Sequence, residues 1–275
     1  MKAAFQGEPG AYSEAAIFEH FGKEATTLPC ESFDLVFEAV AHGTADFGFL
    51  PIENSLAGSI HRNYDLLLQN ELTVIGEHHL HVHHCLIALP QVAAIKDLKR
   101  VISHPQALAQ CDGYLRSYNL KPETAYDTAG AVKIMKEIGD PTTASIASRR
   151  AAELYGMNIL AENIEDNSAN FTRFLIVARQ PLPLSTSDTK TSIAFALKNE
   201  PGSLFKALSV FALRDIDLTK IESRPLVGKP WEYFFYIDFA GSTQEEKCRR
   251  ALEHLNEYAT TLRILGSYPR HKQAW

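Results

Sequence analysis

Segments typical of strands and helices alternate along the first 180 residues, and this order constrains the fold more than any other feature of the chain. Strand-like runs at 2–6, 25–29 and 47–51 are separated by helical patterns at 12–21 and 32–41. Ser32 stands where it would cap the second helix. Alternating strands and helices predict mostly parallel sheets with helices on both faces.

A second lobe is expected within this α/β region. Residues 85–89 and 100–103 are strand-like, and 106–118, 129–138 and 148–155 are helical. We therefore expect lobe one at about 1–81 and 158–180, and lobe two at about 82–157. Two lobes joined by two crossings enclose a central cleft, where small molecules bind and which hinge motion can close.

The last part of the chain has a different order of elements. A linker rich in Pro, Ser and Thr at 181–189 precedes it. Strand, helix, strand, strand, helix and strand patterns follow at 192–197, 203–213, 218–222, 233–239, 244–258 and 261–267. This βαββαβ order predicts a ferredoxin-like domain over 190–275. Its first strand-to-helix turn, at 200–203, would expose backbone N–H groups that can receive a carboxylate.

Composition narrows the possible partners and compartments. The chain has 275 residues and a net charge of -6, which argues against nucleic acid as a partner. We expect no membrane segment and no export signal, because no apolar stretch approaches the roughly 20 residues of a membrane helix. Four scattered cysteines without a CxxC pair predict reduced thiols and a cytoplasmic protein.

The segment 167–177 carries the strongest local indication of a site. Asn170, Thr172 and Arg173 come together beside the apolar run 174–177, which is typical of a buried strand. They supply an amide, a hydroxyl and a guanidinium suited to carboxylates. A turn that uses polar side chains for its own backbone hydrogen bonds is the structural alternative.

Five motifs occur in an order that resembles the prephenate dehydratase family. They are Gly7-Glu8-Pro9-Gly10-Ala11-Tyr12-Ser13, Pro51-Ile52-Glu53-Asn54-Ser55, His104-Pro105-Gln106-Ala107-Leu108, Asn170-Phe171-Thr172-Arg173-Phe174, and Glu222-Ser223-Arg224-Pro225. The last resembles the ESRP motif of phenylalanine-binding ACT domains. The resemblance covers essentially the whole chain and implies a two-lobed catalytic domain, like a periplasmic binding protein, followed by an ACT domain.

Some positions depart from the family's pattern. Glu8 and Ala11 replace the residues usual in the first motif, and the first turn of the ACT domain has Phe205, whose bulk would reshape an effector pocket. No chorismate mutase segment precedes Met1, so the resemblance is to the monofunctional form.

The resemblance implies that prephenate loses carbon dioxide and water to give phenylpyruvate, with no cofactor. It assigns Thr172 an essential role, with Glu53 or a bound water as the proton source. We hypothesise that Arg173 holds the pyruvyl carboxylate. The other candidates for substrate binding are Ser13, Asn54, Ser55, Gln106, Asn170, Phe171 and Phe174.

For the C-terminal domain, the resemblance implies feedback inhibition by L-phenylalanine and a homodimer or homotetramer. The candidate effector residues are Gly202, Ser203, Leu204, Glu222, Ser223 and Arg224. The histidine-rich run 78–84 permits a metal site, but without an HExxH or Cys/His pattern we favour a structural strand and expect no metal.

Two other functions stay open from the sequence. Arogenate dehydratase is a close enzymatic alternative, in which an amine replaces the keto group of the substrate. A non-catalytic amino-acid sensor would use the two lobes as a solute-binding protein does. Replacing Thr172 by Ala distinguishes the sensor from the enzymes, because a sensor would keep its function without that hydroxyl.

Overall fold

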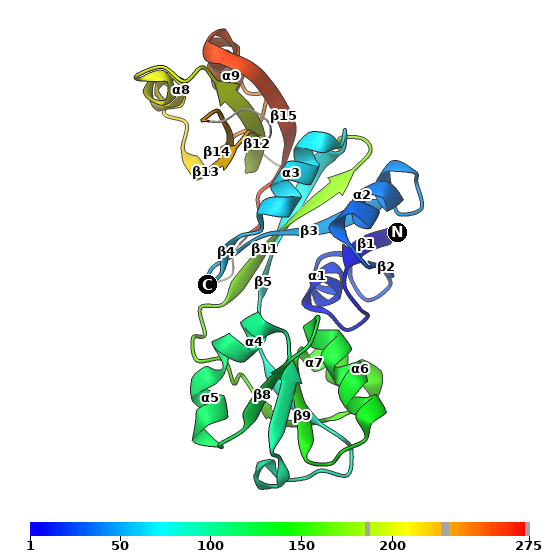
Figure 1. The fold of residues 1–275 in the computed structure, drawn as a ribbon. Coiled ribbons are helices and arrows are strands. Elements are labelled where there is room, and N and C mark those ends of the chain that lie inside the picture. Colours follow the sequence, from blue (N-terminus) through cyan, green and yellow to red (C-terminus); the bar gives the residue numbers. More distant parts are fainter. Residues whose placement is uncertain (185–187, 227–230, 273–275) are drawn as a thin grey trace. The chain divides into compact units, whose positions relative to one another are not determined.

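The computed structural model describes residues 1–184, 188–226 and 231–272 (Figure 1). The chain divides into two compact units, 1–60 with 78–174, and 61–77 with 175–275. The domain boundaries expected from sequence stay predictions, and residues 185–187 of the expected linker lie outside the described residues. Each unit is described below by itself.

The first sheet has the order β2-β1-β3-β11-β5, with the short strand β4 paired to β3. Its strands are β1 (Lys2–Gln6), β2 (Thr26–Cys30), β3 (Phe47–Asn54), β4 (Gly58–Ser59), β5 (Thr73–His81) and β11 (Phe171–Ala178). β1 pairs in parallel with β2 and β3, as the alternation of elements predicted. The intervening helices are α1 (Tyr12–Phe21) and α2 (Phe33–Ala41), and Ser32 caps α2 by accepting from the Leu35 N–H. β5 and β11 contribute residues to both units.

The second lobe has its own sheet, in the order β10-β6-β9-β7-β8. The strands are β6 (Cys85–Ala88), β7 (Arg100–Ser103), β8 (Lys121–Thr124), β9 (Thr143–Ala147) and β10 (Asn158–Glu162). A 3-10 turn, η1 (Ile95–Asp97), precedes β7, and the helices are α4 (Pro105–Gln110), α5 (Asp112–Ser117), α6 (Thr128–Ile138) and α7 (Arg149–Tyr155). The single helix expected at 106–118 is wrong, because Cys111, at φ -119° and ψ 17°, leaves the helical region and separates α4 from α5.

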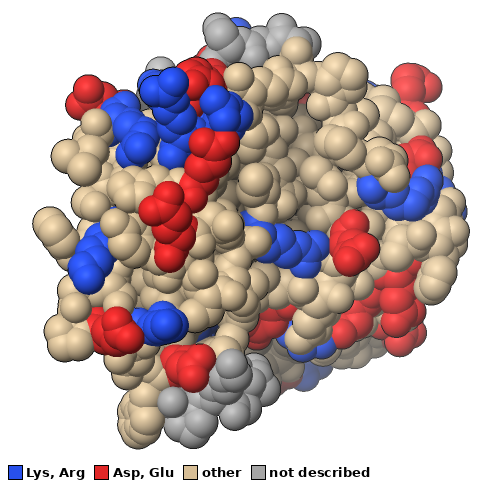
Figure 2. Space-filling model, turned by 90° about the horizontal axis from the view of Figure 1, so that it is seen from above, with Lys and Arg blue, Asp and Glu red and all other residues tan. Residues whose placement is uncertain are grey.

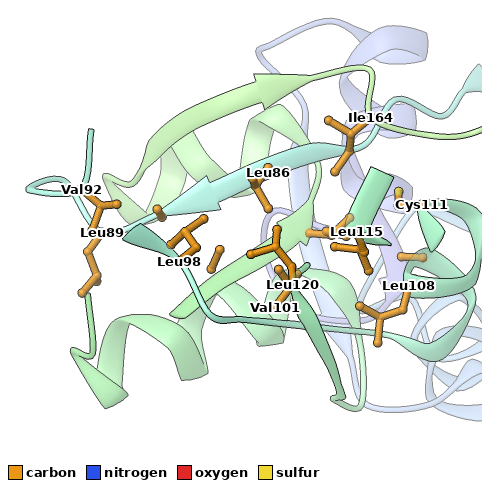
Figure 3. Packing of buried hydrophobic residues seen from close by; sticks show 14 residues of the cluster. Leu86, Leu89, Val92, Leu98, Val101, Leu108, Cys111, Leu115, Leu120 and Ile164 are labelled. Carbon is orange, nitrogen blue, oxygen red and sulfur yellow. The ribbon is translucent and has the colours of Figure 1, made fainter. Parts of the chain in front are cut away.

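One core of this lobe lies between its sheet and helices α4 and α5 (Figure 3), and a second is formed by the sheet with α6 and α7. Leu86 and Val101 come from the sheet, and Leu108, Cys111 and Leu115 come from the helical segment. All are buried side chains, so the break at Cys111 turns the chain without removing apolar contacts from the core. This packing fixes the start of α4, which lines the pocket described below.

The C-terminal sheet is antiparallel and has the order β13-β14-β12-β15. Its elements are β12 (Thr189–Leu197), α8 (Ser203–Ala212), β13 (Leu218–Pro225), β14 (Tyr233–Ala240), α9 (Glu246–Tyr258) and β15 (Ala259–Pro269). This confirms the predicted βαββαβ order. Apolar residues of β12 and β14 pack with those of α8 and α9 in one core.

The second unit also includes α3 (His61–Gln69), which contacts the C-terminal sheet. The Tyr236 hydroxyl donates to the Tyr64 carbonyl, and the guanidinium of Arg263 donates to the Leu68 carbonyl at 2.7 Å. Lys190 on β12 forms a buried ion pair with Glu77 on β5, at 2.8 Å. These contacts hold α3 and the start of β5 against the C-terminal sheet.

Two surface properties bear on the possible partners. Among the described residues, no helix is long and apolar enough to cross a membrane. On the face drawn in Figure 2, basic and acidic side chains are interspersed instead of forming a broad field of one sign. A phosphate backbone would favour a continuous basic surface, and the face in this view does not offer one.

Candidate active site

A pocket of about 400 Å³ lies in the first unit and is lined by both lobes. Lobe one contributes residues from the start of α1, the end of β3 and the start of β11, and lobe two contributes residues from the segment before β6 and the starts of α4 and α6. The polar lining side chains include Tyr12, Ser13, Asn54, His84, His104, Gln106, Gln110, Thr128 and Thr172. Five of the residues predicted from sequence are therefore brought together: Ser13, Asn54, Gln106, Thr172 and Phe174.

Strand alternation on β11 separates the residues of the NxTRF motif. Thr172 and Phe174 line the pocket, so Phe171 and Arg173 point to the opposite face of the strand. The Phe171 ring stacks on His81, with ring centroids 4.3 Å apart. Arg173 is not among the residues lining this pocket, and its role as the clamp for a substrate carboxylate stays a prediction.

Glu53 is not among the residues that line the pocket, although Pro51 and Asn54 of the same strand are. It pairs in register with Ser59 on β4, which is itself part of the lining. The role of Glu53 as a proton source therefore stays a prediction. Ser55 also lies outside the lining, and its hydroxyl donates to the Ala169 carbonyl at 2.6 Å and accepts from the Phe171 N–H.

Buried amides connect β3, β11 and α4 behind the pocket. The Asn54 Oδ1 atom accepts from the backbone N–H groups of Leu56 and Ala57, which can only donate. Its Nδ2 atom must therefore face Asn170, whose Oδ1 atom accepts at 2.8 Å. The Nδ2 atom of Asn170 in turn donates to Gln110 Oε1 at 3.0 Å. Two backbone N–H groups thus fix the direction of every hydrogen bond in this series.

This amide network also orients the hydroxyl of Thr172. The Asn54 Nδ2 atom donates to Thr172 Oγ1 at 3.1 Å and also to the Phe171 carbonyl at 3.2 Å. Thr172 Oγ1 is therefore an acceptor on its protein side, which leaves its own proton to point into the pocket. The arrangement suits a hydroxyl that donates to a substrate oxygen.

Five polar residues in the lining were missed as site residues at the sequence level: Tyr12, Ser59, His84, Gln110 and Thr128. Tyr12 stood inside the first quoted motif but was not assigned a role. Gln110 lies four residues after Gln106 on α4, a spacing that places both on one helix face and that could have indicated it. His84 was treated only as one member of a histidine run, and Thr128 had no distinguishing pattern.

The half-buried Tyr12 and the buried His84 form a pair at the wall of the pocket. The Tyr12 hydroxyl lies 2.6 Å from His84 Nδ1, and His84 Nε2 lies 2.8 Å from Gln110 Oε1. Burial lowers the pKa of the His84 imidazole, so the neutral ring is favoured at neutral pH. Burial also raises the pKa of the Tyr12 hydroxyl well above its ordinary value, so Tyr12 keeps its proton.

The lining contains neither Lys nor Arg among the described residues. Ser13 and Thr128 lie in the first turns of α1 and α6, helices of 10 and 11 residues whose N-terminal N–H groups favour negative charge. An anion in the pocket would therefore meet hydroxyls, amides and helix N-termini instead of a formal positive charge.

The histidine run is part of a strand and its continuation. His83 Nδ1 lies 2.9 Å from Glu165 Oε1, and His81 Nε2 lies 2.6 Å from the Ser168 carbonyl. His78 lies near Glu19, at 3.4 Å. Within the residues that the structure describes, no group of three or more His, Cys, Asp or Glu side chains is arranged to hold a metal ion.

The candidate effector residues fall into two groups in the second unit. Ser203 and Leu204 line a cavity of about 110 Å³, and Gly202 immediately precedes them with a φ of 81°. Glu222 and Arg224 instead contact α3, where Glu222 Oε1 lies 3.2 Å from His61 Nε2 and Arg224 lies 2.9 Å from Asp65 Oδ2. Ser223 lies between them on β13.

Comparisons with known proteins agree with this architecture. A family model described as prephenate dehydratase matches residues 3–182. An Arabidopsis thaliana protein named arogenate dehydratase/prephenate dehydratase 2, chloroplastic, is 50% identical over 98% of this chain and 73% of its own length. A prephenate dehydratase from Arthrobacter aurescens, solved with L-Phe, has 34% identity and a TM-score of 0.90 over 98% of this chain and 90% of its own.

A further solved structure, described as GqqA, a novel type of quorum quenching acylase, has 38% identity and a TM-score of 0.92, with 98% of each chain covered. The expected fold, a mixed α/β region followed by a separate C-terminal domain, is confirmed by these likenesses and by the sheets described above. With the family model spanning well over half of its residues, the chain belongs to the prephenate dehydratase family, whose members are lyases.

Proposed function

We propose that this protein converts prephenate to phenylpyruvate without a cofactor. The bond between the ring and its carboxylate breaks, and carbon dioxide leaves. The electron pair of that bond completes the aromatic ring as the carbon–oxygen bond to the ring hydroxyl breaks. The departing hydroxide takes a proton and leaves as water. Hydroxide is a poor leaving group, so the enzyme must supply a donor at that oxygen.

The orientation of Thr172 is the observation that carries this proposal. Its Oγ1 atom accepts from Asn54 Nδ2 at 3.1 Å, and its side chain lines the pocket. The hydroxyl proton is therefore available to the ring oxygen as it gains negative charge. A hydroxyl held in this way needs no reorganisation as charge develops, which is the basis of electrostatic stabilisation in enzymes. A water molecule is the proton source that we propose behind Thr172, because Glu53 lies outside the lining.

A lining without Lys or Arg suits both carboxylates of prephenate, one of which leaves as carbon dioxide while the other stays. A cation held against the departing carboxylate would stabilise the ground state and slow its loss as neutral carbon dioxide. The carboxylate that stays can be held by N–H and hydroxyl groups at the starts of α1 and α6, where Ser13 and Thr128 lie. We propose these groups in the role that the sequence suggested for Arg173.

The test is phenylpyruvate formation from prephenate by the purified protein after extensive chelation. Thr172→Val removes the hydroxyl with little change in volume, and Thr172→Ser keeps it. We expect Thr172→Val to lower kcat by about a hundredfold or more, in the range seen for loss of one oriented donor, and Thr172→Ser to retain most activity. Turnover unchanged in Thr172→Val would refute the role of this hydroxyl.

The same purified protein serves to test two alternative activities. The Arabidopsis relative is named for both arogenate and prephenate, so kcat/KM should be measured on each substrate. Prephenate is our proposal, and a higher value on arogenate would reassign the substrate. Acylase activity, after the description of GqqA, finds less support here. Ser55, for example, donates its proton to the Ala169 carbonyl and not to a base.

We also propose that L-phenylalanine binds the C-terminal domain and inhibits the enzyme. The Arthrobacter aurescens relative was solved with L-Phe. In this chain, Glu222 and Arg224 contact His61 and Asp65 of α3. α3 begins directly after Ile60, which lines the pocket, so a change in β13 has a covalent route to the lining. L-phenylalanine should lower turnover in the wild type, and Arg224→Ala should weaken this inhibition.

We also propose that the protein forms a homo-oligomer in the cytoplasm. α8 and the residue that caps its C-terminus present Phe205 and Leu213 at 76% and 77% exposure, and an apolar surface of this kind favours burial against a second copy. The four cysteines are free thiols, which suits a reducing compartment. Light scattering of the purified protein should give at least twice the monomer mass of 30.6 kDa, and a monomer would refute the assembly.

A further inference from the structure

We propose that His84 is a positioning residue for this reaction: it holds the side-chain amide of Gln110 so that its NH₂ group faces the pocket. The inference rests on the proposed function, since it assigns a task to residues of the same pocket. His84 is 2% exposed, and it contacts Gln110 and Tyr12 at the pocket wall. No motif identified in the sequence assigned His84, Tyr12 or Gln110 a role.

The direction of the amide network requires the Gln110 carbonyl oxygen to face inward. The network is anchored by the N–H groups of Leu56 and Ala57 and reaches Gln110 Oε1 through Asn54 and Asn170. A reversed Gln110 amide would set its NH₂ group against the NH₂ group of Asn170. The Oε1 atom of Gln110 is thus an acceptor, and whatever else contacts it must donate.

His84 is the second donor to that oxygen, and this requirement fixes its tautomer. His84 Nε2 lies 2.8 Å from Gln110 Oε1 and must carry the proton. In the neutral ring, Nδ1 is then an acceptor, so the single proton of the Tyr12 hydroxyl goes to Nδ1 at 2.6 Å instead of to the His83 carbonyl, which lies 3.0 Å from the same hydroxyl. The His84 backbone N–H is held by Glu165 Oε2 at 2.9 Å, so the ring and its backbone are both fixed.

The consequence lies on the other side of Gln110. Gln110 lines the pocket, and no partner for its Nε2 atom occurs among the described residues. With Oε1 occupied by two donors, both Nε2 protons are directed at the substrate. They can donate to an oxygen that carries or gains negative charge, whereas a reversed amide would present a carbonyl oxygen and repel it. Without His84, Asn170 alone opposes that reversal.

The activity test compares two replacements of His84. Gln places an amide near the position of Nε2 and can still donate to Gln110, whereas Leu fills similar space without a donor. We expect His84→Leu to lower kcat about tenfold and His84→Gln to lower it no more than about threefold, because an oriented donor matters most as charge develops. Equal losses in both variants would overturn the proposal.

A double-mutant cycle separates positioning from a general structural effect. If His84 acts through Gln110, His84→Leu should cause no further loss in a Gln110→Ala background. Losses that multiply would overturn the proposal, because His84 would then act on the substrate or on the fold. Urea unfolding of each variant, monitored by circular dichroism, shows which of them are folded. If His84→Leu does not fold, Tyr12→Phe, which removes the donor to His84 Nδ1, replaces it in the cycle.

A measurement without turnover tests the orientation itself. In nitrogen-15 NMR spectra of histidine-labelled wild type, His84, assigned by its absence in His84→Gln, should be the neutral tautomer with its proton on Nε2. Tyr12→Phe should shift the Nδ1 resonance, since it removes the donor to that atom. A proton on Nδ1 would overturn the proposal. Absence of turnover on prephenate and arogenate would refute the proposed function, while these spectra would still decide the orientation of His84.

Discussion

Replacing Asn54 by Asp changes one NH₂ group to an oxygen at the centre of the amide network. The carboxylate can still accept from the N–H groups of Leu56 and Ala57. Its second oxygen would face Asn170 Oδ1 at 2.8 Å and the Phe171 carbonyl at 3.2 Å, two atoms that only accept. The Thr172 hydroxyl, at 3.1 Å, would rotate to donate to this oxygen, which turns its proton away from the pocket.

The cost follows from these contacts. Asn170 is fully buried, and one buried acceptor left without a donor costs about 1–3 kcal/mol. With repulsion added, we expect the ionised variant to lose about 3 kcal/mol of unfolding free energy relative to its protonated form. At about 1.36 kcal/mol per unit, this raises the pKa of the new carboxyl by about two units, from about 4 to about 6. Once protonated, the carboxyl donates again and restores one bond.

The sign of the pH dependence is opposite to that of an ordinary surface Asp. Below the unfolded-state pKa the carboxyl is protonated in both states, and the penalty is absent. As pH rises toward about 6, the unfolded chain has lost its proton while the folded chain retains it, so stability falls. Above about pH 6 the full penalty applies. The ratio of variant to wild-type kcat should therefore rise as the assay pH falls from about 8 to about 6.

The assay is kcat and urea unfolding of both proteins across that pH range. Asn167→Asp is the matched control, because Asn167 is exposed and its Oδ1 atom also accepts from a backbone N–H, that of Ala169. The control should show little change in either quantity. A ratio that stays flat or falls with decreasing pH, or a variant as stable as wild type at about pH 8, would refute the direction assigned to the network.

Three further predictions concern the rest of the molecule. Lys190→Met should destabilise the protein to urea by about 3–5 kcal/mol, because the buried Glu77 carboxylate loses the lysine that neutralises its charge, and the double variant Lys190→Met with Glu77→Leu should recover much of this loss. Gly10→Ala should lower stability by about 1–3 kcal/mol in a thermal melt, because φ is +93° and the new Cβ would lie 2.9 Å from the Ala151 Cα atom. Gly139→Ala is the control, since Gly139 also has a positive φ but has open space where the new Cβ would lie. Burial raises the pKa of the Cys85 thiol to about 11, so a thiol reagent at about pH 8 should modify Cys85 slowly in the folded protein and quickly in urea.

Local patterns along the sequence were enough to predict most of the fold. Strand and helix periodicity located β1, α1, β3 and the βαββαβ domain to within a few residues, because each pattern reflects burial of one face of one element. The break between α4 and α5 was not predictable in this way. It depends on Cys111 leaving the helical region while staying in the core, which no local pattern encodes.

The site was predictable in part, for reasons visible in two strands. Thr172 and Asn54 lie in quoted motifs and line the pocket, but the motifs include their neighbours Arg173 and Glu53 as well. On β11, strand alternation sends adjacent side chains to opposite faces, so Thr172 and Phe174 line the pocket while Phe171 and Arg173 do not. The sequence predicted a polar loop up to 173 and a strand from 174, whereas β11 begins at Phe171, so the sequence did not indicate which side chains would be turned to the cleft.

The direction of the hydrogen bonds is a property that the sequence could not supply. Asn54, Gln110 and Asn170 are amides whose two ends differ only in the partners they meet, and those partners lie up to 116 residues apart. The N–H groups of Leu56 and Ala57 remove this ambiguity, because a backbone N–H has no acceptor role. From that fixed end, the proton of Thr172 and the NH₂ group of Gln110 both become directed at the pocket. A pocket without a cationic side chain among its described residues can therefore still present donors to an oxygen that gains negative charge.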